Sequence, residues 1–217
     1  MKYKVGYLDE DEGWKQTFYS KFKNHFEVEF FDLSDCSKID DIVQWIEDIS
    51  LNIIIIDFRL NDSGVVSFNG NDVTEAIIKK RPHFPIIILT SYEEEAISQI
   101  ENVNIVNGKC ILDGEKEDQD KLDILITKVK FNIEHYKNRI EVAESRINSI
   151  IDKKLYEPLK IEEEEELTKL YMFLDEINPS DKSIPSNLIQ PESITKLNEF
   201  VKDTKKIIEQ LKIIGNA

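Results

Sequence analysis

Four consecutive isoleucines, residues 53 to 56, run directly into the carboxylate of Asp57. A strand with one face in water alternates apolar and polar residues, whereas a strand buried on both faces carries an unbroken run of β-branched side chains. The run therefore predicts a central strand of a parallel sheet with helices on both faces. In an open sheet of this kind ligands bind at the carboxyl ends of the strands, so Asp57 is either a turn-capping residue or the centre of a site.

Short apolar runs alternate with amphipathic stretches through the first half of the chain. The predicted strands are residues 3–8, 26–31, 53–57, 86–90 and 102–106, and the predicted helices are residues 12–24, 40–49, 71–80 and 92–100. This alternation is typical of a five-stranded, parallel, doubly wound α/β sheet with right-handed crossovers. We expect a flavodoxin-like strand order of 2-1-3-4-5 in a first domain formed by residues 1–118.

From about residue 118 the strand pattern gives way to apolar residues at alternating spacings of four and three. These residues are Leu122, Ile126, Val129, Ile133, Tyr136, Ile140, Ala143, Ile147 and Ile150. The pattern predicts one long helix that starts on the sheet, runs beyond it and ends near Pro158, because proline disfavours helical geometry in the residue before it. Helices at 161–177 and 193–213 complete an all-helical second domain, residues 119–217.

The same apolar stripe can face another chain as a coiled coil or the later helices of its own chain. We expect both arrangements, and therefore a homodimer. The sequence thus predicts a helical module that acts through protein contacts.

Composition excludes some classes of partner. The formal net charge of −15 argues against nucleic acid, whose affinity comes largely from clustered lysine and arginine. No segment approaches about 18 uninterrupted apolar residues, so we expect a cytoplasmic protein with no membrane contact. Cys36 and Cys110 are far apart and lack metal-ligand spacing, so we interpret them as reduced thiols.

Polar residues with complementary chemistry follow the predicted strands. Asp9 and Glu10 follow the first strand and Asp57 the third, and in the expected order these strands are neighbours at the topological switch point. Crowded carboxylates raise one another's pKa unless a cation neutralises them, and an all-oxygen pocket suits Mg²⁺. Thr90 ends the fourth strand and Lys109 follows the fifth, which adds a hydroxyl and an ammonium. Together these residues predict a phosphoryl-transfer site.

This order of landmarks resembles the receiver domain of two-component response regulators over roughly residues 1–118. The family pattern is matched by an acidic pair, a phospho-accepting aspartate, a hydroxyl residue and a lysine: Asp9 and Glu10, Asp57, Thr90, and Lys109. The resemblance implies that Asp57 accepts a phosphoryl group from a histidine kinase or a small phosphodonor. It implies Mg²⁺ bound by Glu10, Asp57 and the main-chain carbonyl of Arg59, with Asp9 acting through a water.

The resemblance also implies the roles of the remaining site residues. Lys109 pairs with the free or phosphorylated carboxylate, and Thr90 turns to bind a phosphoryl oxygen, which biases the face formed by the fourth strand, the next helix and the fifth strand. The tail lacks a basic recognition helix, a GGDEF-like motif and a P-loop. We therefore expect signalling by protein interaction, with no enzymatic activity beyond self-catalysed phosphotransfer and autodephosphorylation.

Three features depart from the family pattern and leave a second interpretation open. The loop from Asp57 to Gly70 is several residues longer than usual, and Cys110 replaces a common proline. Val106 or a neighbour stands where many members carry a switch aromatic. The longer loop and the missing aromatic leave open a receiver-like adaptor whose binding does not depend on phosphorylation.

A third interpretation is enzymatic. The acidic run from Asp9 also resembles the start of haloacid-dehalogenase-like phosphatases, in which Asp9 would be the nucleophile, Asp11 the general acid and Thr90 part of the second motif. In that case Asp57 would have no role, and a final acidic motif is missing.

Overall fold

The computed structural model of this chain describes residues 2–36, 38–113 and 119–177. The chain divides into two compact units, Met1–Arg139 and Ile140–Ala217, each of which is described by itself. Helix α5, Gln119–Lys154, contributes residues to both units. The boundary expected from the sequence, between residues 118 and 119, falls before this helix and stays a prediction about where an independently folding domain ends.

The first unit is built on a five-stranded parallel sheet with the order β2-β1-β3-β4-β5. The strands are β1 Lys4–Leu8, β2 Glu27–Phe30, β3 Ile53–Ile56, β4 Ile86–Thr90 and β5 Val106–Gly108. Leu8 pairs with Ile56 at the end of β3, and Thr90 pairs with Gly108 at the end of β5. The flavodoxin-like fold expected from the sequence is confirmed, and the register brings the carboxyl ends of β1, β3, β4 and β5 to one edge.

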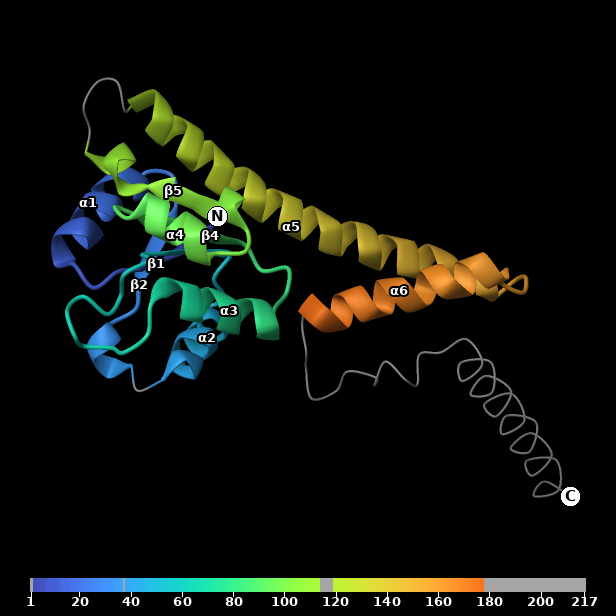
Figure 1. Ribbon diagram of the computed structural model, residues 1–217. Helices are drawn as coiled ribbons and strands as arrows, with labels where there is room; N and C mark the ends of the chain where they lie inside the picture. The colour runs from blue at the N-terminus through green and yellow to red at the C-terminus, as the bar shows by residue number, and fades with distance from the viewer. Residues whose placement is uncertain (1, 37, 114–118, 178–217) are drawn as a thin grey trace, which may run out of the picture. The chain divides into compact units, whose positions relative to one another are not determined.

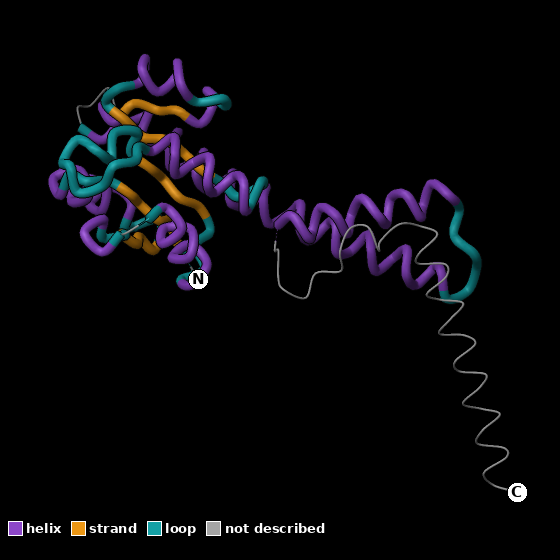
Figure 2. Tube along the Cα trace, turned by 60° about the horizontal axis from the view of Figure 1, so that its bottom comes forward, coloured by secondary structure: helices purple, strands orange, loops and turns teal. Residues whose placement is uncertain are grey.

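Helices cover both faces of this sheet (Figures 1 and 2). Their bounds are α1 Glu12–Phe22, α2 Ile39–Asp48, α3 Gly70–Lys80, α4 Glu93–Gln99 and the first part of α5. One apolar layer joins α2, α3 and α4 to Ile54 and Ile56, while the other joins α1 and α5 to Ile53 and Ile55. All four isoleucines are fully buried, which is why β3 tolerates no polar residue on either face.

The fifth strand lies two to four residues later than predicted. Residues 102–106 were expected as a strand, but Val103–Ile105 form a 3₁₀ turn and the strand begins at Val106. The reason is local, because the Asn102 side chain accepts a hydrogen bond from the Asn104 amide and holds the chain in a turn. The long helix α5 ends at Lys154, four residues before Pro158, where its end was predicted. The other described helices and strands begin and end within about two residues of the prediction, as expected for helix and strand ends.

The second unit contains an antiparallel helix pair formed by the end of α5 and by α6, Ile161–Ile177. Ile147 and Ile150 of the heptad stripe are buried together with Leu167 of α6. Arg146 donates to both carboxylate oxygens of Glu166 at 2.7 Å, which ties the two helices together. This part of the stripe therefore faces the same chain, while pairing between chains stays a prediction.

Two further expectations concern the helical tail and the membrane. The helix expected at 193–213 lies outside the described residues. Within the described ranges, no helix combines the length and the apolar character that a bilayer crossing requires.

Candidate functional site

Three carboxylates converge at the edge where β1 and β3 end. Asp9 and Glu10 follow β1, Asp57 follows β3, and the Asp57 amide donates to the carbonyl of Leu8 at 2.8 Å. Asp9 is fully buried, Asp57 is 3% exposed and Glu10 is partly buried. One oxygen from each of the three carboxylates lies within 4.8 Å of the other two. Residues separated by nearly fifty positions in the sequence thus meet in one small volume.

Lys109 places an ammonium between two of these carboxylates. Its Nζ lies 2.8 Å from Asp9 Oδ2 and 3.1 Å from Asp57 Oδ1. The lysine is 3% exposed, and the Trp14 ring covers the ammonium with its centroid 5.3 Å away. Thr90, the last residue of β4, is also buried, and its hydroxyl accepts a hydrogen bond from the Tyr92 amide at 3.1 Å. The structure therefore brings together five of the six residues singled out in the sequence.

The electrostatics of the cluster are those of crowded, partly desolvated carboxylates. Burial raises the pKa of Asp57, although the charge of Lys109 opposes the rise. Burial likewise raises the pKa of Glu10 to about 7, with the charges of Asp57 and Asp9 adding to the rise. One ammonium does not compensate three carboxylates, so the site favours an additional cation.

The donor set fits a hard divalent cation such as Mg²⁺. Glu10 Oε2 is buried and has no hydrogen-bond partner among the described residues. Buried polar oxygens are nearly always paired, so this orphaned oxygen points to a ligand. Mg²⁺ is usually held by one or two carboxylates and keeps several waters. Glu10 and Asp57 would supply these carboxylates.

Arg59, the sixth residue, lies on the loop after Asp57, and its side chain turns toward α4. The guanidinium carbon lies 3.8 Å from the centroid of the Tyr92 ring, and the guanidinium forms an ion pair with Glu95. This contact joins the loop after β3 to the start of α4. The expected role of the Arg59 carbonyl as a metal ligand stays a prediction.

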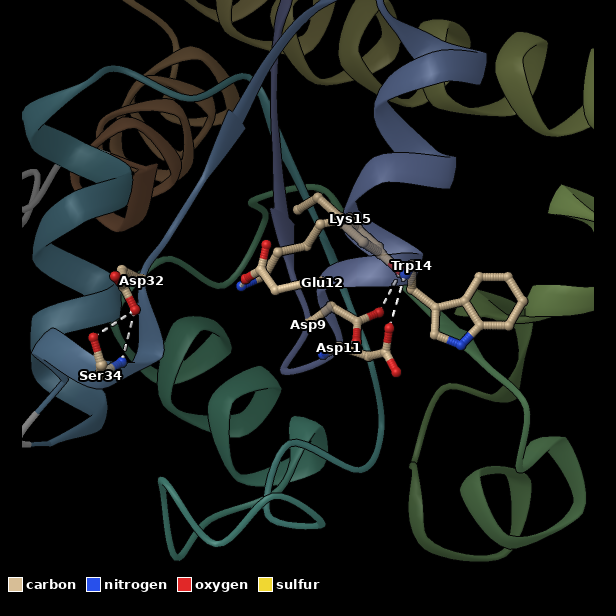
Figure 3. Close-up of polar contacts among 8 residues, drawn as sticks. Asp9, Asp11, Glu12, Trp14, Lys15, Asp32 and Ser34 are labelled. Atoms are coloured by element: carbon tan, nitrogen blue, oxygen red, sulfur yellow. Dashed lines mark hydrogen bonds and ion pairs between the residues drawn. The ribbon is translucent and has the colours of Figure 1, made fainter.

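Asp11 has a structural contact that bears on the phosphatase interpretation. It is the N-cap of α1, since its side chain accepts from the Trp14 amide at 3.0 Å. Its own amide donates to Asp9 Oδ1 at 3.0 Å (Figure 3). Asp11 is thus engaged in starting the helix, a role that negative charge at a helix N-terminus explains without catalysis.

The long loop after β3 returns to the site through Gly70. The Gly70 amide donates to the carbonyl of Phe58 at 2.7 Å, and a Cβ on Gly70 would lie 2.2 Å from the carbonyl oxygen of Asp57. Phe58 and Leu60 are buried, so the beginning of the loop is anchored in the core. Only glycine fits this close approach of two backbone segments.

Tyr7 is a site residue that the sequence analysis missed. Its hydroxyl donates a short hydrogen bond to Asp9 Oδ2, and its side chain is fully buried. Burial, reinforced by the negative charge of Asp9, raises the pKa of Tyr7 well above its usual value, so the phenol keeps its proton. The available signal was the alternation of strand side chains, which puts residues 7 and 9 on the same face.

Comparison with known proteins finds solved structures that resemble this chain but no match in sequence. No protein-family model matches the chain, and no curated protein matches it in sequence. Among solved structures, the apo receiver domain of nitrogen regulatory protein C is 15% identical with a TM-score of 0.45, covering 61% of this chain and 95% of that one. The receiver domain of an HD-domain protein from Pseudomonas fluorescens Pf-5 is 16% identical with a TM-score of 0.48, covering 64% and 93%.

A third solved structure is the BeF₃-activated receiver domain of DrrB, which is 18% identical with a TM-score of 0.44 and covers 62% of this chain and 99% of that one. At these identities the likeness concerns the fold alone. The solved structures to which this chain is similar thus include receiver domains.

Proposed function

We propose that this protein is a phosphorylation-controlled receiver that accepts a phosphoryl group on Asp57 and signals through protein contacts of its helical residues. The observation that carries the proposal is the buried Asp57 carboxylate, which lies 3.1 Å from the Lys109 ammonium and beside the oxygens of Asp9 and Glu10. The donor would be a histidine kinase or a small phosphodonor, encountered in the cytoplasm.

The chemistry follows from the positions of the side chains. A carboxylate oxygen of Asp57 attacks phosphorus, an O–P bond forms, and the bond from phosphorus to the donor's leaving group breaks with its electron pair leaving on that group. Lys109 offsets the negative charge of the phosphoryl oxygens, and the Thr90 hydroxyl donates to one of them. Glu10 and Asp57 would hold Mg²⁺, which would supply positive charge beside the carboxylates and the incoming phosphoryl group.

The test is a phosphorylation assay with acetyl phosphate and Mg²⁺, read by intact-protein mass. The wild type should gain one phosphoryl group per chain, and Asp57→Asn should gain none because the nucleophile is lost. Asp62→Asn is the matched control, since Asp62 lies on the exposed part of the same loop. Equal uptake by the wild type and Asp57→Asn would overturn the proposal.

A second candidate, the constitutive adaptor, is favoured by one observation. Val106 begins β5 without an aromatic side chain, so the usual partner of a turning Thr90 is missing at that place. Beryllofluoride with Mg²⁺ separates the two functions. A phosphorylation-controlled receiver changes its oligomeric state or its partner affinity on adding the mimic, whereas the adaptor shows the same values with and without it.

A further inference from the structure

Tyr7 contacts the acidic site directly and has no part in the mechanism above. We propose that Tyr7 is a positioning residue that keeps Asp9 out of the metal's inner ligand shell, and that the site thereby selects Mg²⁺ over Ca²⁺. This inference rests on the proposed metal site, but it concerns the choice of metal and not the transfer of the phosphoryl group.

The hydrogen bonds of Asp9 are the first step of the argument. Asp9 Oδ2 accepts from the Tyr7 hydroxyl and lies 2.8 Å from the Lys109 ammonium, while Asp9 Oδ1 accepts from the Asp11 amide at 3.0 Å. Both oxygens of this fully buried carboxylate therefore already have donors. The neighbouring Glu10 differs, because its buried Oε2 has no hydrogen-bond partner among the described residues.

The second step is that the Tyr7 hydroxyl is held in place by packing. The Tyr7 ring stacks on Phe18 with centroids 4.0 Å apart and planes 2° apart, and Phe18 stacks on Phe22 at 4.0 Å. All three rings are fully buried. The Tyr7 ring on β1 is thus fixed against two stacked rings of α1, and moving its hydroxyl away from Asp9 would disturb this packing.

The third step connects this geometry to metal choice. Mg²⁺ is usually bound by one or two carboxylates with several waters, whereas Ca²⁺ accepts six to eight oxygen ligands in flexible geometry. With Asp9 occupied by donors, Glu10 and Asp57 remain as direct carboxylate ligands, which suits Mg²⁺. Removal of the Tyr7 hydroxyl frees a lone pair on Asp9 Oδ2 and offers a third carboxylate, which suits Ca²⁺.

The experiment measures Mg²⁺ and Ca²⁺ binding to the full chain and to Tyr7→Phe. Trp14 and Trp45 are the two tryptophans, so a Trp45→Phe background leaves Trp14, whose ring covers the Lys109 ammonium, as the reporter. Calorimetric titration provides an independent reading. Tyr19→Phe is the matched control, because it loses the same hydroxyl from the exposed surface of α1.

We expect Tyr7→Phe to bind Ca²⁺ about tenfold more tightly, a change of about 1.4 kcal/mol and the size of one hydrogen bond to a charged group. Mg²⁺ affinity should change by less than about threefold, and Tyr19→Phe should match the wild type. In a Tyr7→Phe, Asp9→Asn double variant the gain should disappear, because the third carboxylate is gone. If Tyr7 had a purely structural role, Tyr7→Phe would lower the affinities for Mg²⁺ and Ca²⁺ by the same factor.

Two results would overturn the inference: an unchanged ratio of the two affinities in Tyr7→Phe, which includes a loss of both affinities by the same factor, or tighter binding of Ca²⁺ than Mg²⁺ by the wild type. The last measurement needs no variant and therefore holds even if Tyr7→Phe fails to fold. Because metal titration does not involve phosphoryl transfer, a wild type that gains no phosphoryl group but shows the predicted metal preference would refute the proposed function alone.

Discussion

Glu10 is the residue in which the electrostatic cost of the site is most visible. Its pKa is raised from 4.5 to about 7, first by burial and then by the charges of Asp57 and Asp9. Between these two pH values the folded state binds more protons than the unfolded state, so stability falls as pH rises. The contribution of protonated Glu10 is complete below pH 4.5 and is lost as pH rises through about 7.

This sign gives a prediction for Glu10→Gln in metal-free protein. At pH 8 the variant should be more stable than the wild type, and near pH 4.5 the two should be equal. Since Glu10 is partly exposed, solvent screening leaves a difference of about 1 kcal/mol. Urea unfolding in EDTA at the two pH values measures it, with exposed Glu12→Gln as the control. A variant less stable than the wild type at pH 8 would contradict the prediction.

At the scale of residues, the sequence was sufficient to predict Asp9, Glu10, Asp57, Thr90 and Lys109 as site residues, but it did not identify Tyr7. The positions of Asp9, Asp57 and Lys109 after successive strands were enough to expect them at one edge, because parallel strands present their carboxyl ends together. Tyr7 could not be assigned in the same way. A tyrosine in a buried strand is usually a core residue, and only the observed hydrogen bond to Asp9 distinguishes it from one.

At the scale of elements, one set of contacts links the site to α4. Arg59 lies over the Tyr92 ring and pairs with Glu95, while the Tyr92 amide donates to the Thr90 hydroxyl. If the Thr90 hydroxyl turns toward a phosphoryl group, its hydrogen bond with the Tyr92 amide breaks. Tyr92 then keeps only its contact with the Arg59 guanidinium out of these two contacts. The loop after β3 and the start of α4 are thereby coupled through neighbouring side chains without an aromatic residue at Val106.

The contact of Arg59 with Tyr92 and Glu95 can be tested with Arg59→Ala. The variant loses both the stacking on Tyr92 and the ion pair with Glu95, so amide hydrogen exchange over residues 92–99 should become about fivefold faster. Arg81→Ala, which removes a similar contact with the Phe84 ring, is the control and should leave these amides unchanged. Unchanged exchange in Arg59→Ala would show that Arg59 does not hold the start of α4.

The elements also show where sequence patterns stop being sufficient. The four isoleucines of β3 form an unbroken apolar run, which is typical of a strand buried on both faces and not of a loop. The position of β3 was therefore predicted to within one residue. The fifth strand was misplaced because Asn102 competes for backbone hydrogen bonds, and the apolar residues of NVNIV fit a strand or a 3₁₀ turn equally well. What decides is the pairing of Val106 with Ile88 across the sheet, which is a tertiary contact.

At the scale of the whole molecule, the heptad stripe has two kinds of partner within the described chain. Its early residues, such as Val129 and Ile133, pack in the core with the sheet, and its later residues Ile147 and Ile150 pack with α6. A stripe used in this way is not free to form a two-chain coiled coil along its full length. The sequence could predict the long helix but not this division, because apolar spacing does not say which surface a helix meets.

A homodimer would therefore need another surface of α5. Ile124, Phe131 and Val142 are 67%, 63% and 58% exposed. Their spacings of 7 and 11 residues place them along one side of the helix, since both numbers are close to whole turns of about 3.6 residues. These three apolar side chains on one side of α5 are therefore exposed to solvent in the single chain. We expect this row to be the contact between two copies.

The prediction is that the full chain is a dimer and that Phe131→Glu with Val142→Glu makes it a monomer, because each change would place a carboxylate in the apolar contact. Light scattering after size-exclusion chromatography, at several protein concentrations, measures the mass directly. Asn148→Glu adds the same charge on a different side of α5 and should leave the dimer intact. A monomeric wild type, or a double variant that remains dimeric, would exclude this row as the contact. Neither substitution changes a residue of the heptad stripe, so the packing of α5 against the sheet and against α6 should be preserved.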